Sequence, residues 1–405
     1  MGDVSRIRVT GPLESYVSGF VVALMERGYT PVSIGHQLRL MAHVSRWLAS
    51  EGFGSDDLSP ARVEQFLAAR RAAGYVNYLT PRALLALLEY LRDVGVAPPA
   101  GEPALSQVEE LLGRYRGWLC SERGLAAVTA RNYADMVRPF VAARLNATGE
   151  LELRGLAAGD VLAFVLAQCP HRRSGSAKLL VTALRSLLGY LHVEGVIVRP
   201  LAPVVPSVAG WRLTGLRRGL AAEQVMALLD SCDLDTAVGA RDFAILKLLV
   251  RLGMRRGEVA GLTLDDIDWR SGEITVRGKG GRSERLPLPV DVGDALADYL
   301  RRGRRASAEG RAVFVRVKAP HRALTPAGVS QVVIAAGRRA GLGRVNAHRL
   351  RHTTATELLR SGAPLVEVGQ LLRHRSQQTT AIYAKVDRER LRALARPWPS
   401  LEGVS

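Results

Sequence analysis

Apolar residues recur every three or four positions through most of the first half of this chain, a period typical of amphipathic helices. Glycine, proline and aspartate interrupt the runs, and almost no stretch alternates as a half-buried strand does. We therefore predict two helical domains, 1–103 and 104–200, each with about four helices. A segment rich in proline and glycine, 201–219, follows them and is expected to be a linker.

The two helical segments share short sequences in the same order, which indicates an internal duplication. The shared blocks are 26–28, 58–66 and 87–96 in the first segment, and 122–124, 156–164 and 187–196 in the second. The last pair contains the closely similar sequences LLEYL and LLGYL. We expect two tandem copies of one small helical fold of the SAM-like type.

The pattern changes after residue 219. Helices are expected from 221 and at 240–252, 291–303, 326–340, 349–361, 364–372 and 387–395. Two short strands, 273–277 and 285–288, flank a glycine-rich turn and predict a hairpin, and 312–316 is expected as a third strand. The fold class predicted for the whole chain is mainly α, with a small three-stranded antiparallel sheet in a C-terminal domain, 220–405.

Charge distinguishes the two helical segments. The whole chain has a formal net charge of +18, which indicates a polyanionic partner. Residues 1–103 contain as many acidic as basic residues, whereas 104–218 and 219–405 are both basic. We therefore expect 1–103 to make mainly protein contacts, or to bind a secondary DNA site weakly, rather than to grip the main site.

Cysteine usage and hydropathy bear on the compartment. The three cysteines, Cys120, Cys169 and Cys232, are scattered and do not have the spacing of a zinc site or a disulfide framework. No apolar run approaches the roughly 20 residues that span a bilayer, and the N-terminus lacks the apolar core of a signal peptide. These observations predict a cytoplasmic protein.

The stretch 347–385 concentrates the candidate chemistry. His348 and Arg351 are three residues apart, so on a helix they share one face. His374 and Tyr383 follow in the next segments. Arginines, histidines and one tyrosine suggest a phosphate held by cations while a phenolic oxygen attacks it. Zinc is the rival interpretation, because His348 and His352 are four residues apart, but two arginines and no carboxylate in the motif make a divalent cation unfavourable there.

Four sequences in this half of the chain match a known family. They are GMRRGEVAGLTLDDID (253–268), GKGGRSERLPLP (278–289), AHRLRHTTATELL (347–359) and LLRHRSQQTTAIY (371–383). In their order and intervals they resemble the tyrosine recombinases, also called phage-type integrases. The resemblance covers about 220–390, and 104–200 fits the helical core-binding domain of that family.

The resemblance implies an enzyme that cleaves and rejoins DNA strands at specific sites through a 3′-phosphotyrosine, with no metal, ATP or other cofactor. The implied partners are double-stranded DNA and further copies of the chain in a tetramer on DNA, alone or with partner recombinases. Two alternatives stay open from the sequence. One is a catalytically silent DNA-binding regulator on the same scaffold, and the other is a type IB topoisomerase, which relaxes supercoils as a monomer.

The resemblance also implies six functional residues, which are Arg255, Lys279, His348, Arg351, His374 and Tyr383. The tyrosine would be the nucleophile, and the two arginines would hold the non-bridging oxygens of the scissile phosphate. The lysine, on the hairpin, would protonate the leaving 5′-oxygen. The first histidine would take or relay the tyrosyl proton, and the second would donate a hydrogen bond to a non-bridging oxygen.

One position departs from the family pattern. Family members commonly have glycine before the second histidine, as Leu-Gly-His, whereas this chain has Leu372-Arg373-His374. An arginine there either adopts the same backbone conformation or shifts His374. In the first motif, Glu258 comes just after Arg255 and is expected to orient an arginine through a salt bridge.

Overall fold

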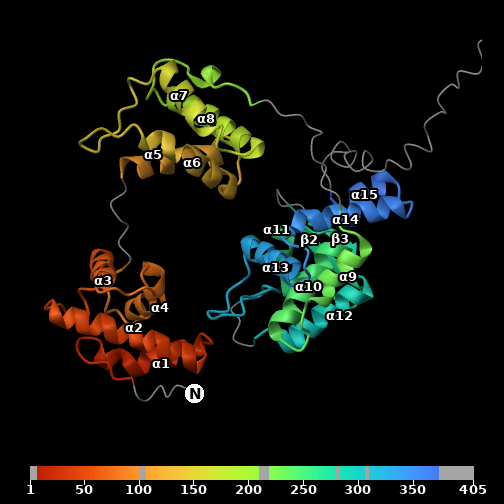
Figure 1. Ribbon diagram of the computed structural model, residues 1–405, viewed down its shortest axis with the longest axis horizontal. Helices are drawn as coiled ribbons and strands as arrows, with labels where there is room; N and C mark the ends of the chain where they lie inside the picture. The colour runs from red at the N-terminus through yellow and green to blue at the C-terminus, as the bar shows by residue number, and fades with distance from the viewer. Residues whose placement is uncertain (1–6, 100–105, 209–218, 279–282, 306–309, 374–405) are drawn as a thin grey trace, which may run out of the picture. The chain divides into compact units, whose positions relative to one another are not determined.

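The computed structural model describes residues 7–99, 106–208, 219–278, 283–305 and 310–373. This part of the chain is mainly helical and contains one small antiparallel sheet, which confirms the predicted fold class in outline. Figure 1 shows the helices and strands with their labels. Their apolar side chains form three larger hydrophobic cores, within 9–97, 108–205 and 220–350.

The first region begins with a 3₁₀ turn, η2 (Glu14–Tyr16), and continues with α1 (Val17–Glu26), α2 (Pro31–Ser50), α3 (Pro60–Ala72) and α4 (Pro81–Asp93). Three of these helices begin with a proline, whose fixed φ and missing N–H suit the first position of a helix. Thr30 caps α2, because its side-chain oxygen accepts the N–H of Ser33 at 3.3 Å. Local sequence signals therefore account for these helix starts.

The second region contains α5 (Gln107–Ser121), α6 (Ala127–Ala142), α7 (Ala158–Gln168), α8 (Ser174–Val193) and the 3₁₀ turn η3 (Ala202–Val204). Leu201 and Val205, which the sequence assigns to the linker, are buried in its core. The Arg185 side chain donates two hydrogen bonds, of 3.2 and 2.8 Å, to the Val205 carbonyl. The packed part of this region thus extends at least to Val205.

The repeated sequence blocks occupy equivalent places in the two regions. The Glu-Arg-Gly blocks end α1 and α5, where Gly28 and Gly124 have φ of 79° and 58°. LLEYL lies in α4 and LLGYL in α8, and the leucines and tyrosine of both are buried. Gly95 and Gly195 follow these helices with φ of 75° and 68°. Both regions therefore end corresponding helices with a left-handed glycine, the residue that best tolerates this conformation.

The third region contains most of the remaining elements. Its helices are α9 (Ala222–Asp230), α10 (Ala237–Arg251), α11 (Arg256–Ala260), α12 (Val290–Asp298), α13 (Pro326–Arg339), α14 (Ala347–Arg360) and α15 (Leu365–Leu371). Two short turns complete it, η4 (Leu264–Asp266) and the π-type turn η5 (Tyr299–Gly303). The helix expected at 291–303 is therefore α-helical only as far as Asp298. The helix expected at 387–395 lies outside the described residues.

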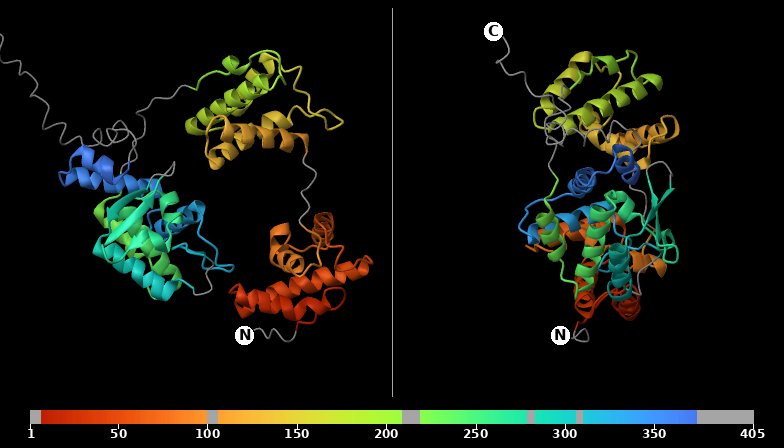
Figure 2. Two further views of the ribbon diagram at one scale, coloured as in Figure 1. Left: turned by 180° about the vertical axis from the view of Figure 1, so that it is seen from behind. Right: turned by 90° about the vertical axis from the view of Figure 1, so that its right-hand side faces the viewer.

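The sheet consists of β1 (Ile267–Asp268), β2 (Glu273–Arg277) and β3 (Ser283–Pro287), in that order and antiparallel. Ile274 pairs with Ile267 on one side and with Leu286 on the other. All three side chains are buried, so this row fixes the register of the strands. Figure 2 shows the sheet on one flank of the helices of this region.

The prediction of a third strand at 312–316 is wrong. That segment forms only two isolated bridges, Thr263 with Ala312 and Val315 with Ala323. Its apolar residues Val313, Phe314 and Val315 are all buried, so they do not alternate between a core face and a solvent face. A short run of apolar residues is consistent with a buried strand, but its composition alone does not show that the segment is one. The third strand is instead β1, just before the hairpin.

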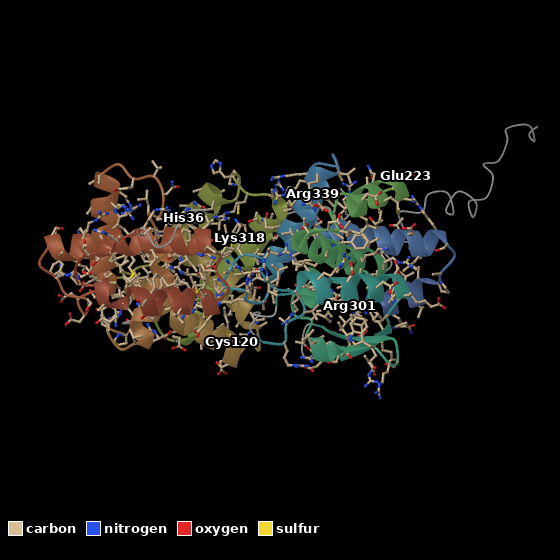
Figure 3. The ribbon with its side chains drawn as sticks, turned by 90° about the horizontal axis from the view of Figure 1, so that it is seen from below. His36, Cys120, Glu223, Arg301, Lys318 and Arg339 are labelled. Atoms are coloured by element: carbon tan, nitrogen blue, oxygen red, sulfur yellow. The ribbon has the colours of Figure 1, made fainter. Side chains whose placement is uncertain are left out.

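The core of the third region includes both helical and non-helical segments. The aromatic rings of Tyr299 and Phe314 are stacked, with centroids 5.4 Å apart. Arg339 of α13, labelled in Figure 3, donates a 2.9 Å hydrogen bond to the carbonyl of Ser231, just after α9. None of the helices in the described part of the chain has the length and hydropathy of a membrane span.

Candidate functional site

The turn between α10 and α11 is built around a close approach that excludes side chains. Gly253 has φ +55°, and a Cβ atom placed on it would lie 2.6 Å from Cδ2 of Leu372. Met254 follows with no exposed surface and anchors the turn in the core. Thr354 of α14 donates a 2.7 Å hydrogen bond to the Val250 carbonyl of α10. The turn is thereby held against both α14 and the end of α15.

Arg255 occupies the N-cap position of α11. Its Nη1 donates to Oε1 of Glu258 at 2.6 Å, and its backbone N–H donates to Oε2 of the same carboxylate at 2.8 Å. Its Nη2 donates to the carbonyl of Arg373 at 3.1 Å. The side chain is 43% exposed, so it is held in place and still reaches solvent. The next residue, Arg256, instead donates to the hydroxyl of Ser330 in α13 at 3.1 Å.

The N-terminal part of α14 carries two of the predicted site residues, His348 and Arg351. Asn346 caps the helix by accepting the N–H of Arg349 at 2.9 Å, which fixes where the helix begins. His348 then lies on the exposed surface, and Arg351 lies one turn later and is only 2% exposed. The ring of His348 contacts that of His352 edge to face, with centroids 4.3 Å apart.

Arg351 links three segments of the chain. Its Nη1 donates to the carbonyl of Gly253 at 2.6 Å, and its Nη2 donates to the carbonyl of Leu372. The next carbonyl, that of Arg373, accepts Nη2 of Arg255. The two predicted phosphate-binding arginines therefore donate to consecutive carbonyls of one turn. Residues almost a hundred positions apart are brought to the same place, with His348 one helical turn away.

Arg373 resolves the departure from the family pattern. It has φ +54°, the left-handed conformation that favours glycine, so the arginine adopts the backbone that a glycine would have allowed. Its side chain is 3% exposed and donates to Oε2 of Glu258 at 2.8 Å. The sequence indicated this position as an exception, but did not predict that its side chain would join the site. The available signal was an arginine at a position where family members commonly have glycine, together with a glutamate in the first motif, 115 positions earlier.

Glu258 is the buried anion of the site. Burial alone would raise its pKa, but the charges of Arg373 and the hydrogen bonds from Arg255 hold the pKa below the ordinary value of a glutamate. The carboxylate is therefore ionised at neutral pH, and it forms ion pairs with two arginines. The expected salt bridge of Glu258 is confirmed. Two cations around one anion leave a net positive charge at the surface where Arg255 emerges.

The three other predicted residues, Lys279, His374 and Tyr383, lie outside the described residues. The chain nevertheless leads directly to two of them. Arg277 pairs with Ser283 as the last residue pair of the β2–β3 hairpin, and Lys279 belongs to the connection between them. His374 follows Arg373, whose carbonyl accepts the hydrogen bond from Arg255.

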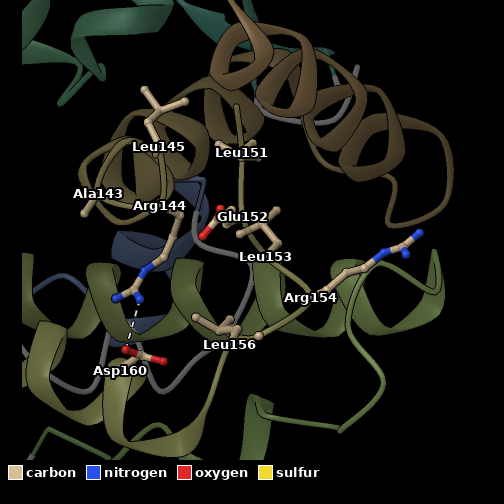
Figure 4. Close-up of a pocket in the computed structure, with 10 residues that line it drawn as sticks. Ala143, Arg144, Leu145, Leu151, Glu152, Leu153, Arg154, Leu156 and Asp160 are labelled. Carbon is tan, nitrogen blue, oxygen red and sulfur yellow. Dashed lines mark hydrogen bonds and ion pairs between the residues drawn. The ribbon is translucent and has the colours of Figure 1, made fainter. Parts of the chain in front are cut away.

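A hollow in the second region is lined by 143–145, 151–156 and Asp160, and Figure 4 shows the 2.9 Å ion pair between Arg144 and Asp160 at its edge. It contains none of the predicted site residues. Within the described ranges, no group of three or more His, Cys, Asp and Glu side chains is arranged to hold a metal ion.

Comparison with protein families and curated proteins gives extended matches. The description of the family model that matches residues 218–390 is "Phage integrase family". "Putative integrase/recombinase y4rA" of Sinorhizobium fredii is 42% identical over 394 residues, covering 96% of this chain and 95% of that protein. "Tyrosine recombinase XerD" of Listeria monocytogenes is 30% identical over 289 residues, covering 70% of this chain and 97% of that protein.

Solved structures share the fold. A crystal structure of XerH site-specific recombinase bound to palindromic difH substrate, a post-cleavage complex, has a TM-score of 0.55 at 22% identity and covers 83% of this chain and 94% of its own. A lambda integrase tetramer bound to a Holliday junction has a TM-score of 0.51 at 18% identity, with 75% and 87% coverage. With a relative of 42% identity along nearly its whole length, this chain belongs to the phage integrase family of tyrosine recombinases, the site-specific integrases and recombinases.

Proposed function

We propose that this recombinase cleaves and rejoins DNA through a covalent 3′-phosphotyrosine, with Arg255 and Arg351 as the clamp on the scissile phosphate. The observation that carries the proposal is that both guanidinium groups are held on consecutive carbonyls of the turn after α15. Forked, permanently charged donors stabilise the charge that develops on the oxygens of a five-coordinate phosphorus. Their fixed positions lower the reorganisation that the reaction would otherwise require.

We assign the remaining roles as the resemblance to the tyrosine recombinases implies, and with them protons and bonds balance. The phenolic oxygen of Tyr383 attacks phosphorus, and His348 accepts or relays its proton. The bond from phosphorus to the 5′-oxygen breaks, and Lys279 donates the proton that this oxygen needs. His374 donates a hydrogen bond to a non-bridging oxygen. The reverse attack by a 5′-hydroxyl restores the phosphodiester, so the phosphotyrosine conserves the bond energy and no ATP is required.

We infer that the working assembly is a tetramer on two DNA duplexes. The solved relatives whose fold this chain shares include complexes with DNA, one of them a tetramer on a Holliday junction. The net charge of +18 suits binding to a polyanion, with counterions released from the phosphates. A DNA substrate and three scattered cysteines are consistent with action in the cytoplasm.

We propose that 104–200 is the core-binding domain, that 220–405 is the catalytic domain with a C-terminal tail, and that 1–103 arose by duplication of 104–200. Support for the duplication comes from the corresponding helix order and from the left-handed glycines that follow α1 and α5, and α4 and α8. The connection 201–219 would then join two DNA-binding halves. The packed part of the second domain would then extend into this connection at least to Val205, which lies in the second core.

The decisive experiment replaces the nucleophile, as Tyr383→Phe. The substrate is a nicked duplex carrying a site selected by the full-length protein from random DNA, so that a cleaved strand cannot be religated. We expect the wild-type protein to form an SDS-resistant adduct, with EDTA present, and the variant to bind the site equally well without forming it. An adduct formed by the Phe variant would exclude Tyr383 as nucleophile, and loss of wild-type activity in EDTA would restore the metal interpretation.

A further inference from the structure

Arg373 has an unusual backbone conformation for its residue type. It is one of two non-glycine residues with positive φ in the described part of the chain. The left-handed region is disfavoured for residues with a Cβ atom, and such conformations persist where surrounding contacts hold them. Arg373 is held by hydrogen bonds from its own side chain and by its backbone N–H, which donates to the carbonyl of Gln370 at 2.8 Å.

The side chain of Arg373 is almost completely buried. Its Nη2 donates to Oε2 of Glu258 at 2.8 Å, and its Nη1 donates to the carbonyl of Leu371 at 2.9 Å. Its Nε is buried without a hydrogen-bond partner in the described structure. Burying a guanidinium is unfavourable unless it is paired, so the carboxylate of Glu258 stabilises the buried side chain of Arg373.

Arg255 depends on the same two groups. Its guanidinium is bound on one side by the Glu258 carboxylate and on the other by the carbonyl of Arg373. If Glu258 had no other cation, Arg255 alone would neutralise it and would form a closed pair with little net charge. With Arg373 already paired to the carboxylate, Arg255 keeps its positive charge for a second anion.

We propose that Arg373 is a positioning residue for Arg255: its buried guanidinium neutralises Glu258, and its carbonyl orients the Arg255 side chain toward the scissile phosphate. This inference rests on the proposed function of Arg255. It also gives a reason for arginine at this position, because a glycine would supply the backbone conformation without the charge.

The proposal leads to a specific pH effect. The charged groups that act on Glu258 are Arg255, at the start of its own helix, and Arg373, beyond α15. Both lower its pKa, so the ion pairs are present above the ordinary pKa of a glutamate and are lost as the pH falls through the lowered, folded-state pKa. Without Arg373, only Arg255 opposes the effect of burial on Glu258, so the folded-state pKa of Glu258 rises. The acid limb of the cleavage rate then moves to higher pH.

Arg373→Gly is the sharpest variant, because glycine keeps the left-handed backbone and removes only the side chain. We expect its single-turnover cleavage rate on the nicked substrate to fall about 10- to 100-fold, the size expected when a reacting group is misplaced. Site affinity, measured in the Tyr383→Phe background, should stay within about twofold. Arg373→Lys, which keeps a cation without the fork, should recover part of the rate and of the pH profile.

The controls separate positioning from structural support. Arg241→Lys changes another buried arginine of this region, paired with Asp242 at 2.7 Å, and should lower thermal stability without moving the acid limb. In an Arg255→Ala background, Arg373→Gly should cause little further loss of rate, because the two residues act as one unit. Equal rates and acid limbs for wild type and Arg373→Gly would overturn the inference. So would a loss of thermal stability with an unchanged acid limb. If the wild-type protein forms no adduct, the proposed function fails and this inference fails with it.

Discussion

The helical regions and the region 219–373 differ in what their cores contain. Among the described residues of 7–99 and 106–208, the buried side chains are apolar except for Ser45 and Arg70. The described residues of 219–373 bury six side chains that carry a full charge in water, namely Arg241, Asp242, Glu258, Asp266, Arg351 and Arg373.

Apolar cores and cores with buried charges place different requirements on the sequence. An apolar core needs only shape and volume, and many sequences satisfy it. Buried charges cost several kcal/mol each unless they are paired or hydrogen-bonded. Three of their ion pairs, at 2.7 to 2.8 Å, are Arg241 with Asp242, Arg373 with Glu258, and Arg277 with Asp266. Glu258 also pairs with Arg255 at 2.6 Å, and Asp242 with Arg339 at 3.8 Å. A region that keeps so many paired charges gains defined positions for its arginines, which a phosphate site requires.

The largest expected effect tests whether a buried arginine affects the cleavage rate because it is buried or because of the region in which it lies. Arg351→Ala removes a transition-state donor and should lower the cleavage rate by about 100- to 1,000-fold, the usual cost of one such donor. Arg70→Ala removes the buried arginine of the first region, which stacks on Tyr75 with its guanidinium carbon 3.9 Å from the ring centroid. Its cleavage rate on saturated DNA should remain within about twofold, since Arg70 is in a region to which no chemical step is assigned.

Single-turnover cleavage with each variant in excess over DNA measures both effects. Melting curves provide the control, because either variant can lose stability. If Arg70→Ala slows cleavage as much as Arg351→Ala does while both remain folded, the proposed division between the two regions fails.

A smaller effect concerns two left-handed glycines. Gly195, which ends α8, would have no atom within 4 Å of an added Cβ, whereas Gly253 would meet Leu372 at 2.6 Å. Gly195→Ala should therefore reduce the free energy of unfolding by about 1 kcal/mol, the backbone cost alone. Gly253→Ala adds overpacking and should cost about 2–4 kcal/mol in total.

Urea denaturation of each variant, followed by circular dichroism, gives these values, with m-values checked for constancy. Equal losses for the two glycines would mean that Leu372 can move away at little cost. The turn after α15 would then be a poor anchor for Arg351.

The smallest expected effect concerns the salt dependence of DNA binding. Residues 1–103 have no net charge, so their deletion should change the slope of log K against log salt concentration by less than about one unit. Arg173→Ala, at the exposed N-terminus of α8 in the basic second region, is the comparison and should reduce the slope by about one. Titrations of the selected site at several salt concentrations measure both. A slope reduced by several units after the deletion would show that the first region grips DNA through a local basic surface.

The sequence predicted much of the local structure, for reasons that are themselves local. Helix periodicity, the prolines that begin α2 to α4 and the glycines that end α4 and α8 depend on contacts within one or two turns. The β2–β3 hairpin was also evident from its glycine-rich turn. The prediction of a strand at 312–316 failed because the conformation of this segment depends on contacts with other segments, such as that of Ala312 with Thr263. Hydrophobic periodicity does not report such contacts.

The motifs also distinguished Arg255 and Arg351 from the many other arginines, through resemblance and spacing. Only the tertiary structure decided how they are held. Arg351 donates to carbonyls of Gly253 and Leu372, and Arg255 shares Glu258 with Arg373. These contacts join segments up to about 120 residues apart, and each depends on burial, because an ion pair in water is worth little and one in the interior must be satisfied. Burial is a property of the packed chain, so the role of Arg373 could emerge only once α10, α14 and α15 were brought together.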